Sequence, residues 1–215
     1  MAEARQGAYD ILQRVDQGGY SDLLLDNWLR QHPGLDPRER GLLTELVYGV
    51  LRLRGRLDFA LTRFCKQPLD RIEPGALRLL RLGAYQILEL ERVPDRAAVH
   101  ATVELARQVG MERVTGLING VLRSLVREVG SIEWPMPDKP RPYMEHVCSL
   151  PGWIVKEMMR LLPNVEAITL AEAMAQQAPM TLRVNTLKQS REDYLSALTD
   201  ACLLYTSDAA DDWLV

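Results

Sequence analysis

The sequence has little of what holds a disulfide-stabilised fold or a metal centre together. Its 215 residues include three cysteines (Cys65, Cys148 and Cys202) and three histidines, with no C-x-x-C pair. This scarcity argues for a reducing compartment, which we take to be the cytoplasm, and against a metal site. No apolar run approaches the roughly eighteen residues of a membrane span, and the first residues lack the apolar core of a signal peptide.

Lysine is scarce as well, and no strong charge of one sign is present. Four of the 26 basic residues are lysines, so arginine supplies most of the positive charge, and the net charge is −3. Residues 1–130 hold 19 basic against 17 acidic side chains. A domain so close to neutrality must bind a polyanion through a local patch and not through a global field.

Helical periodicity dominates the first 130 residues. The stretch from Gly75 to Leu125 holds three helical patterns, and the first is apolar on nearly all sides, which is typical of a helix enclosed by neighbours. We therefore expect residues 3–128 to form an all-α bundle of about seven helices. Its buried side chains are expected to include Leu80, Ala84, Ile87, Val103, Ile118 and Leu122.

Capping residues predict where several helices begin and end. Ser21 or Asp22 is expected to cap a second helix, and Asp36 before Pro37 to cap a third. Gly55 is expected to break that third helix before residues 57–64. Asp95 is expected to cap a helix reaching Val109, closed by Gly110 in a left-handed conformation.

The sequence after residue 130 changes character. Ser131 to Tyr143 holds four prolines, which predicts an extended connector. Beyond it, residues 153–162 and 165–176 read as helices, and residues 180–184 alternate as a strand does. Ser190, with Asp193 three residues later, is expected to cap a last helix that ends near residue 201.

Several segments together resemble a known module. The sequence from Leu46 to Leu61, from Leu82 to Arg107 and from Gly116 to Leu125 resembles the NusB-type RNA-binding domain across residues 3–128. The sequence from Ser149 to Pro163 and from Gln176 to Leu198 resembles the segment that joins such a domain to the catalytic domain in the RsmB (Sun, Fmu) family. That family comprises bacterial rRNA cytosine-C5 methyltransferases.

The resemblance implies a mainly α fold: a NusB-like all-α helical bundle followed by the truncated start of an α/β methyltransferase module. The implied division is a helical RNA-binding domain at 1–130, a linker at 131–143 and an incomplete methyltransferase part at 144–201. The letters from Cys202 to Asp212 resemble a translated sequencing adapter, so residues 202–215 are expected to be a non-native tail.

The chemistry that the family requires is not found in this sequence. Cytosine-C5 methyl transfer needs a nucleophilic cysteine, which the family places after proline or threonine, and a Pro-Gly-Gly-Lys cofactor loop. Cys65 and Cys148 stand in neither setting and are interpreted as small buried residues. We therefore expect no catalytic, cofactor-binding or metal-binding residue here, with S-adenosylmethionine used only by the full-length parent.

RNA binding is the activity expected of this chain, with small-subunit rRNA as the partner and a monomeric state. The candidate contacts are Arg38, Arg40, Arg52, Arg54, Arg56, Arg78, Arg81, Arg183 and Asn185. For each arginine of the bundle the alternative is an ion pair with Glu39, Glu45, Asp58 or Glu73. For Arg183 and Asn185 the alternative is hydrogen bonding at a strand edge.

Two further interpretations stay open at this stage. Asn119 is interpreted as a structural tie between helices, and His100 as a packed or exposed helix residue. A free-standing NusB-type transcription antitermination factor, binding RNA and a ribosomal-protein partner, is the alternative function. It would end near Ser131, so residues 144–201 discriminate between the two. A helical protein-interaction module is the third possibility.

Overall fold

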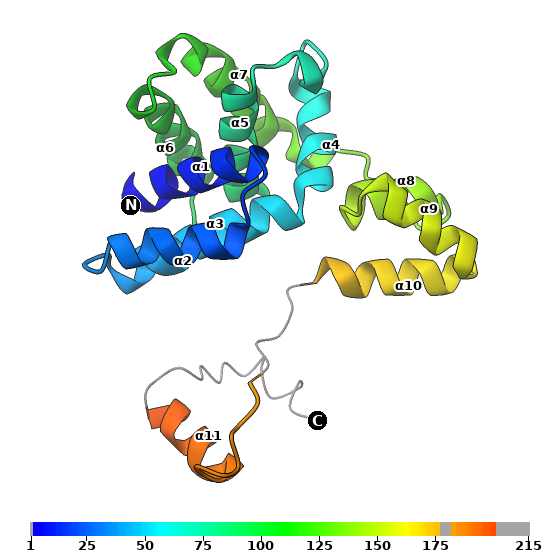
Figure 1. The fold of residues 1–215 in the computed structure, drawn as a ribbon. Coiled ribbons are helices and arrows are strands. Elements are labelled where there is room, and N and C mark those ends of the chain that lie inside the picture. Colours follow the sequence, from blue (N-terminus) through cyan, green and yellow to red (C-terminus); the bar gives the residue numbers. More distant parts are fainter. Residues whose placement is uncertain (1, 177–181, 201–215) are drawn as a thin grey trace. The chain divides into compact units, whose positions relative to one another are not determined.

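The computed structural model describes residues 2–176 and 182–200, which fall into two compact units divided after Gln176 (Figure 1). The bundle consists of α1 (Ala2–Asp16), α2 (Ser21–Gln31), α3 (Pro37–Arg52), α4 (Arg54–Phe64), α5 (Pro74–Leu88), α6 (Asp95–Gln108) and α7 (Thr115–Glu128). Short 3-10 turns η1 (Leu69–Arg71), η2 (Glu112–Val114) and η3 (Val129–Ser131) connect or follow these helices. None of the helices in the described ranges is long and apolar enough to cross a membrane.

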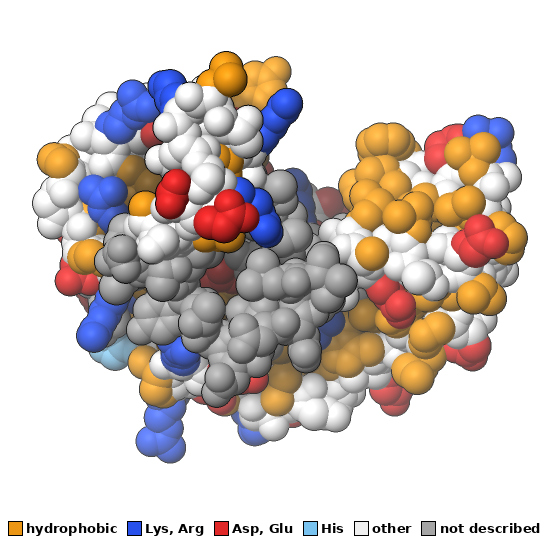
Figure 2. All heavy atoms as spheres, turned by 90° about the horizontal axis from the view of Figure 1, so that it is seen from below, with side chains coloured by type: hydrophobic (Ala, Val, Ile, Leu, Met, Phe, Trp, Pro, Cys, Tyr) orange, Lys and Arg blue, Asp and Glu red, His pale blue; other side chains and the backbone are white. Residues whose placement is uncertain are grey.

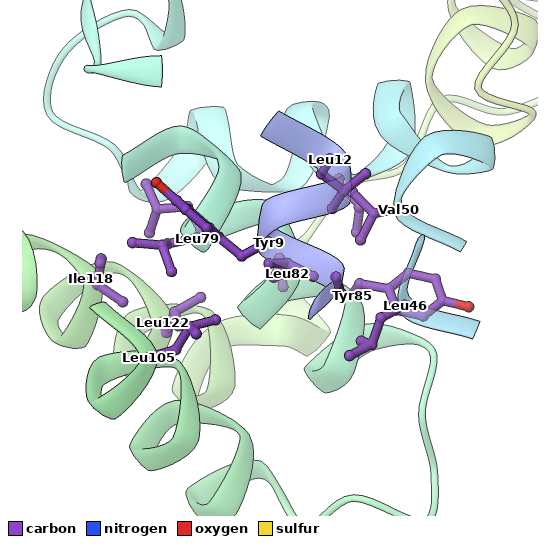
Figure 3. Packing of buried hydrophobic residues seen from close by; sticks show 14 of the residues in the cluster. Tyr9, Leu12, Leu46, Val50, Leu79, Leu82, Tyr85, Leu105, Ile118 and Leu122 are labelled. Atoms are coloured by element: carbon purple, nitrogen blue, oxygen red, sulfur yellow. The ribbon is translucent and has the colours of Figure 1, made fainter. Parts of the chain in front are cut away.

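Helix α5 forms the centre of the bundle, because α1, α3, α4, α6 and α7 all pack against it. Figure 3 shows Leu79, Leu82 and Tyr85 of α5 among side chains from these neighbours. Each of the three is at most 1% exposed. A helix that is apolar on nearly all sides is stable only when it is enclosed in this way.

The expected bundle and most of its expected core are confirmed. Seven α-helices lie within residues 2–128. Leu80, Ala84, Ile118 and Leu122 are fully buried, whereas Ile87 and Val103 are only partly buried and pack against the edge of the same core.

Two of the predicted helix termini are confirmed. Asp36 caps α3, since its Oδ1 accepts the backbone N–H of Arg38 at 2.8 Å, and Pro37 is the first helical residue. Gly110 follows α6 with a φ of +73°, the left-handed conformation expected of a closing glycine. Local side-chain chemistry alone determines both features, which is why the sequence shows them.

Two predicted caps are wrong by one position. Ser21 is the first residue of α2 and follows Tyr20, and Asp95 is the first residue of α6 and follows Pro94; neither preceding residue gives a side-chain cap. Asp22 and Asp95 instead lie in the first helical turn. Carboxylates there are stabilised by the positive end of the helix dipole without acting as caps.

Gly55 was expected to break the third helix, but it lies inside α4. The break falls at Leu53, whose ψ of 21° leaves the α-helical range. A Cβ atom added at Gly55 would lie 2.5 Å from the carbonyl oxygen of Glu145 and 3.2 Å from Cα of Ser149. The glycine therefore permits a close approach between α4 and the backbone of a later segment.

The proline-rich connector, which precedes that later segment, packs on the bundle instead of extending away from it. Residues 132–136 have no regular secondary structure, yet Ile132 is 8% exposed and belongs to the bundle core. The Trp134 ring lies 5.5 Å from the Phe59 ring and 4.8 Å from the Arg56 guanidinium. The chain then continues through α8 (Pro140–Pro142) and the π-helical turn η4 (Tyr143–Val147).

A second, smaller core follows the connector. It is formed by Met144, Cys148, Leu150, Val155, Met158, Ala167 and Ala171, between η4, α9 (Gly152–Leu161) and α10 (Asn164–Ala175). Ser149 stands at the junction with a φ of 59°, and its Oγ accepts the backbone N–H of Arg56 at 2.7 Å. Figure 2 shows hydrophobic side chains gathered on the surface of this α8–α10 part. They include Trp153, Leu161 and Val165, which are 66–76% exposed.

The strand expected at residues 180–184 is not present where the structure describes it. Met180 and Thr181 lie outside the described residues, and Leu182 to Asn185 carry no strand hydrogen bonds. The side chain of Asn185 accepts the backbone N–H of Leu187 at 3.0 Å and starts a turn. Such local bonds compete with sheet pairing, and a strand forms only with a partner.

The capping pattern before the last helix is confirmed. Ser190 Oγ accepts the backbone N–H of Asp193 at 3.0 Å and donates to its carboxylate at 2.7 Å, ahead of α11 (Arg191–Asp200). The expected non-native tail from Cys202 lies outside the described residues.

The enclosure of α5 makes a testable prediction about stability. Replacing Leu80 or Ile118 by alanine is expected to lower the free energy of unfolding by about 2–5 kcal/mol, because each leaves a cavity in a packed core. Chemical denaturation followed by circular dichroism measures this value. Leu23→Ala, at a side chain 59% exposed, is the control and should change it by less than about 0.5 kcal/mol. Equal effects of core and surface substitutions would contradict the assigned packing.

A pair of glycines tests the contact between α4 and the backbone of Glu145 and Ser149. Gly41→Ala should stabilise the protein by up to about 1 kcal/mol, since it improves helix propensity at an exposed site where a Cβ meets nothing within 4 Å. Gly55→Ala carries the same propensity gain but should destabilise by about 1–3 kcal/mol, because the methyl group overlaps a backbone oxygen. Urea denaturation monitored by tryptophan fluorescence compares the two. A stabilising Gly55→Ala would refute the close approach.

Candidate nucleic-acid interface

Two of the nine candidate RNA contacts, Arg78 and Arg81, have buried side chains that pair with partly exposed carboxylates of the bundle. Arg78 of α5 donates to Asp16 of α1 at 2.8 Å, and its guanidinium lies 4.9 Å from the Tyr9 ring centre. Arg81, one turn further along α5, makes two parallel bonds to Asp58 of α4 at 2.7 and 2.8 Å. Each guanidinium is largely buried and is satisfied by its carboxylate, so moving it to a phosphate would break internal hydrogen bonds. The structure gives both arginines a role in the fold.

Arg52 and Arg56 take part in another internal cluster, between α3, α4 and α5. Arg56 Nε lies 2.9 Å from Glu89 Oε1, but the two groups are not aligned as a hydrogen bond. Tyr85 donates to Glu45 in the same region; burial, followed by this bond, raises the pKa of its hydroxyl. The Nε atom of Arg52 is buried and has no hydrogen-bond partner among the described residues.

The alternation of arginines at positions 52, 54 and 56 does not create one basic face. Residues two apart face the same side on a strand but not on a helix. Arg54 is exposed, whereas Arg52 and Arg56 are half-buried. The triplet is therefore divided between solvent and the internal cluster.

The remaining candidates differ in their availability. Arg38 and Arg54 are exposed and make no ion pair with the described part of the chain. Arg40 donates to the carbonyl oxygens of Pro33 at 3.2 Å and Leu35 at 3.4 Å. Arg183 and Asn185 are exposed in the second unit. As RNA contacts, all of these stay predictions.

A basic groove between α6 and α7 was not anticipated from the sequence. It has a volume of about 870 Å³, and its basic lining consists of Arg96, His100, Arg107, Arg123 and Arg127. The signal that could have revealed it is helical spacing: positions 96, 100, 103 and 107 form one row of α6, and positions 116, 119, 123 and 127 form one row of α7. His100 is exposed, which was one of its two expected placements.

Asn119 also lines this groove, and the prediction that it ties helices together is wrong. Its side chain is half-buried and makes no hydrogen bond to the residues that the structure describes. The amide faces the groove because its position belongs to the row of α7 opposite α6.

Neither described cysteine has the character of a nucleophile. Burial raises the pKa of the Cys148 thiol to about 11, and the negative charge of Glu172 acts in the same direction. The positive charge of Arg56 offsets only part of this increase. Burial also raises the pKa of Cys65. Thiols protonated at neutral pH are unreactive. Within the described ranges, no group of three His, Cys, Asp or Glu side chains could hold a metal ion.

The raised pKa of Cys148 predicts a pH profile for its alkylation. At pH 8 the folded protein should carry about a hundredfold less thiolate at Cys148 than a thiol of ordinary pKa near 9.0. Iodoacetamide should therefore modify Cys148 slowly, with a rate that rises as the pH approaches 11. Peptide mapping by mass spectrometry gives the rate, and urea-denatured protein is the control. Equal rates in the folded and denatured protein would contradict this prediction.

Comparison with known proteins gives two matches along the chain. Residues 2–127 match the NusB family, and residues 150–212 match the ferredoxin-like domain of RsmF/B-like methyltransferases. The second match continues past residue 201, so it gives no support to the expectation that the chain leaves its family at Cys202.

Among curated proteins, the chain is 35% identical over 210 residues to a probable ribosomal RNA small subunit methyltransferase B of Bacillus subtilis (strain 168). It is 32% identical over 212 residues to a protein of the same name from Synechocystis sp. (strain ATCC 27184 / PCC 6803 / Kazusa). Each alignment covers 97% of this chain but only 46% and 47% of the relatives, so the chain spans about half their length.

The crystal structure of PH0851 shares the fold. It superposes with a TM-score of 0.65 and covers 93% of this chain and 44% of that chain. Sequence identity is 14%, so this likeness concerns the fold alone.

Proposed function

The chain belongs to the NusB family over residues 2–127, and from that premise we propose that it is the RNA-binding N-terminal part of an rRNA methyltransferase. The reaction of the whole enzyme would transfer a methyl group from S-adenosylmethionine to C5 of a cytosine in small-subunit rRNA, in the cytoplasm. The observation that carries the proposal is the succession of two matched domains, a NusB domain followed by the ferredoxin-like domain of RsmF/B-like methyltransferases.

The proposed role of this chain is binding and not chemistry. Two of its cysteines, Cys65 and Cys148, have raised pKa values, so neither supplies the thiolate that attack on C6 of cytosine requires. The neighbourhood of each cysteine also lacks the sequence setting that the methyltransferase resemblance implies. We propose that cofactor binding and methyl transfer belong to the part of the relatives that this chain does not cover.

The proposed RNA contacts come from side chains that the fold leaves available. Arg38, Arg54 and Arg183 are exposed and make no ion pair with the described part of the chain. Arginines in this state can bind phosphates without breaking an internal bond. Arg78 and Arg81, by contrast, are proposed to act only in the fold.

A free-standing antitermination factor of the NusB type is the other function that the first domain allows. It requires no sequence beyond the bundle, whereas residues 150–212 match a domain of RsmF/B-like methyltransferases. The second core of α9 and α10 likewise packs beyond the bundle. Both observations favour the methyltransferase assignment.

RNA binding is testable by its salt dependence. The protein should bind a structured small-subunit rRNA transcript, with log Kd rising linearly with log salt, because arginine–phosphate contacts release counterions. Arg38→Gln combined with Arg54→Gln should reduce this slope by about 0.9 for each lost phosphate contact. Filter binding over a salt series gives the slope, and Arg160→Gln, at an ion-paired arginine outside the bundle, is the control. Salt-independent binding would contradict the proposal.

Cofactor binding is tested in the same preparation. Isothermal titration with S-adenosylmethionine should release no binding heat. Saturable heat, or methyl transfer to RNA by this chain alone, would show that the proposed division of labour is wrong.

A further inference from the structure

The groove between α6 and α7 has walls of a consistent chemical character. Arg96, His100 and Arg107 stand on the α6 side, and Asn119 and Arg123 on the α7 side. Three aliphatic side chains lie between these polar groups: Val99, Val103 and Val126. No aspartate or glutamate lines the groove. A basic channel with an apolar floor suits a ligand that is both anionic and partly apolar.

The positive charge of the groove is available to a ligand. Arg96 and Arg123 are exposed and make no ion pair with the described part of the chain. Arg107 pairs with Glu104 at 2.8 Å and Arg127 with Glu128 at 2.7 Å, both between exposed side chains. Exposed pairs contribute little to stability, so a phosphate can replace either carboxylate at small cost.

Gly116 on the α7 wall has no packing explanation. A Cβ atom at Gly116 would meet nothing within 4 Å, whereas one at Gly83 in α5 would lie 2.4 Å from Leu122 Cδ1. Gly120 of the same helix is equally open but does not line the groove, so the lack of packing at Gly116 is not in itself a sign of a ligand; it leaves the backbone of the groove wall accessible. Because Gly116 has no side chain, nothing projects from this position into the groove.

Asn119 supplies a further, independent indication. Asparagine is a poor helix former, and here its amide makes no internal hydrogen bond among the described residues. The side chain lines the groove half-buried, with one acceptor and two donor hydrogens free for a ligand. This is the chemistry that recognises the edge of a nucleobase.

We propose that the α6–α7 groove binds one single-stranded segment of RNA, with its arginines on the phosphates, Gly116 beside the sugar–phosphate backbone and the Asn119 amide on a base edge. This inference rests on the proposed RNA-binding function and assigns a separate part of it to this groove. The groove lining combines basic and aliphatic side chains, which suits the phosphates and unpaired bases of a single strand, whereas a duplex keeps its bases stacked and paired. Positively charged grooves are the usual sites for single strands.

The first test compares two double variants of equal charge. The probes are a short fluorescent single-stranded oligoadenylate, its DNA counterpart and a stable RNA hairpin, measured by fluorescence anisotropy. Arg96→Gln with Arg123→Gln should weaken binding of the single-stranded RNA by roughly tenfold, as expected for two lost phosphate contacts. Arg14→Gln with Arg71→Gln removes two exposed arginines outside the groove and should leave that affinity within about twofold.

The second test changes the shape of the groove without changing its charge. Gly116→Leu places a side chain on the wall and should weaken single-strand binding severalfold. Gly120→Leu is the matched control, because Gly120 is in the same helix, also meets nothing within 4 Å of an added Cβ, and does not line the groove. Neither variant should lower the melting temperature, so a loss of binding by Gly116→Leu alone reports on the groove.

The outcomes separate this inference from the proposed function. If the protein binds the hairpin but not the single strand, or if the groove variants bind the strand as the parent does, the groove assignment is overturned and RNA binding stands. If the protein binds none of the RNAs, both are overturned. Tighter binding of the DNA strand than of the RNA strand would also overturn the assignment to RNA. So would a competition experiment in which polyglutamate displaces the fluorescent RNA as well as unlabelled RNA does, because it would show binding of any polyanion.

Discussion

The enclosure of α5, with two of its arginines held by carboxylates of other helices, is the constraint on which the rest of the bundle depends. Leu79, Leu80 and Leu82 exclude water on several sides of α5, so its polar groups must find partners within the protein. Arg78 finds Asp16 on α1, and Arg81 finds Asp58 on α4. Losing either carboxylate would leave a largely buried guanidinium without its partner, so these pairs favour the placement of α1 and α4 beside α5.

Some arginines of the bundle are buried in ion pairs and others are exposed, and this difference determines which of them can bind a ligand. An arginine that completes the core cannot serve a phosphate, and the half-buried Arg56 is occupied by Glu89 and Trp134. Positive charge available for RNA therefore lies on the outer helices, where side chains are either free or in weak exposed pairs. Arg96 and Arg123 of the α6–α7 groove are of this kind. The near-neutral charge of the domain is consistent with both uses, because Arg78 and Arg81 each pair with a carboxylate of the bundle.

Helical periodicity predicted the bundle, the burial of residues such as Leu80 and Ile118, and the cap at Asp36, because each depends on local spacing or local hydrogen bonds. The alternative of an ion pair with Asp58 is confirmed for Arg81, whereas Asp16, the partner of Arg78, was not among the expected carboxylates, since spacing gives the face of a helix but not the partner across it. Gly55 was misread for the same reason: its neighbour, Glu145, is distant in sequence. The expected strand at Leu182 failed because pairing is non-local, whereas the turn at Asn185 is local.

The packing of residues 131–149 on the bundle has a consequence for the arrangement of the first unit. Trp134 on Phe59, His146 on Phe59 with ring centres 4.9 Å apart, and Ser149 on the backbone of Arg56 join the bundle to α9 and α10 within one compact unit. The segment after α7 is thus packed against the bundle and is not a free tether. For the RNA binding proposed above, this packing means that α9 and α10 stay beside the bundle when the bundle engages a ligand.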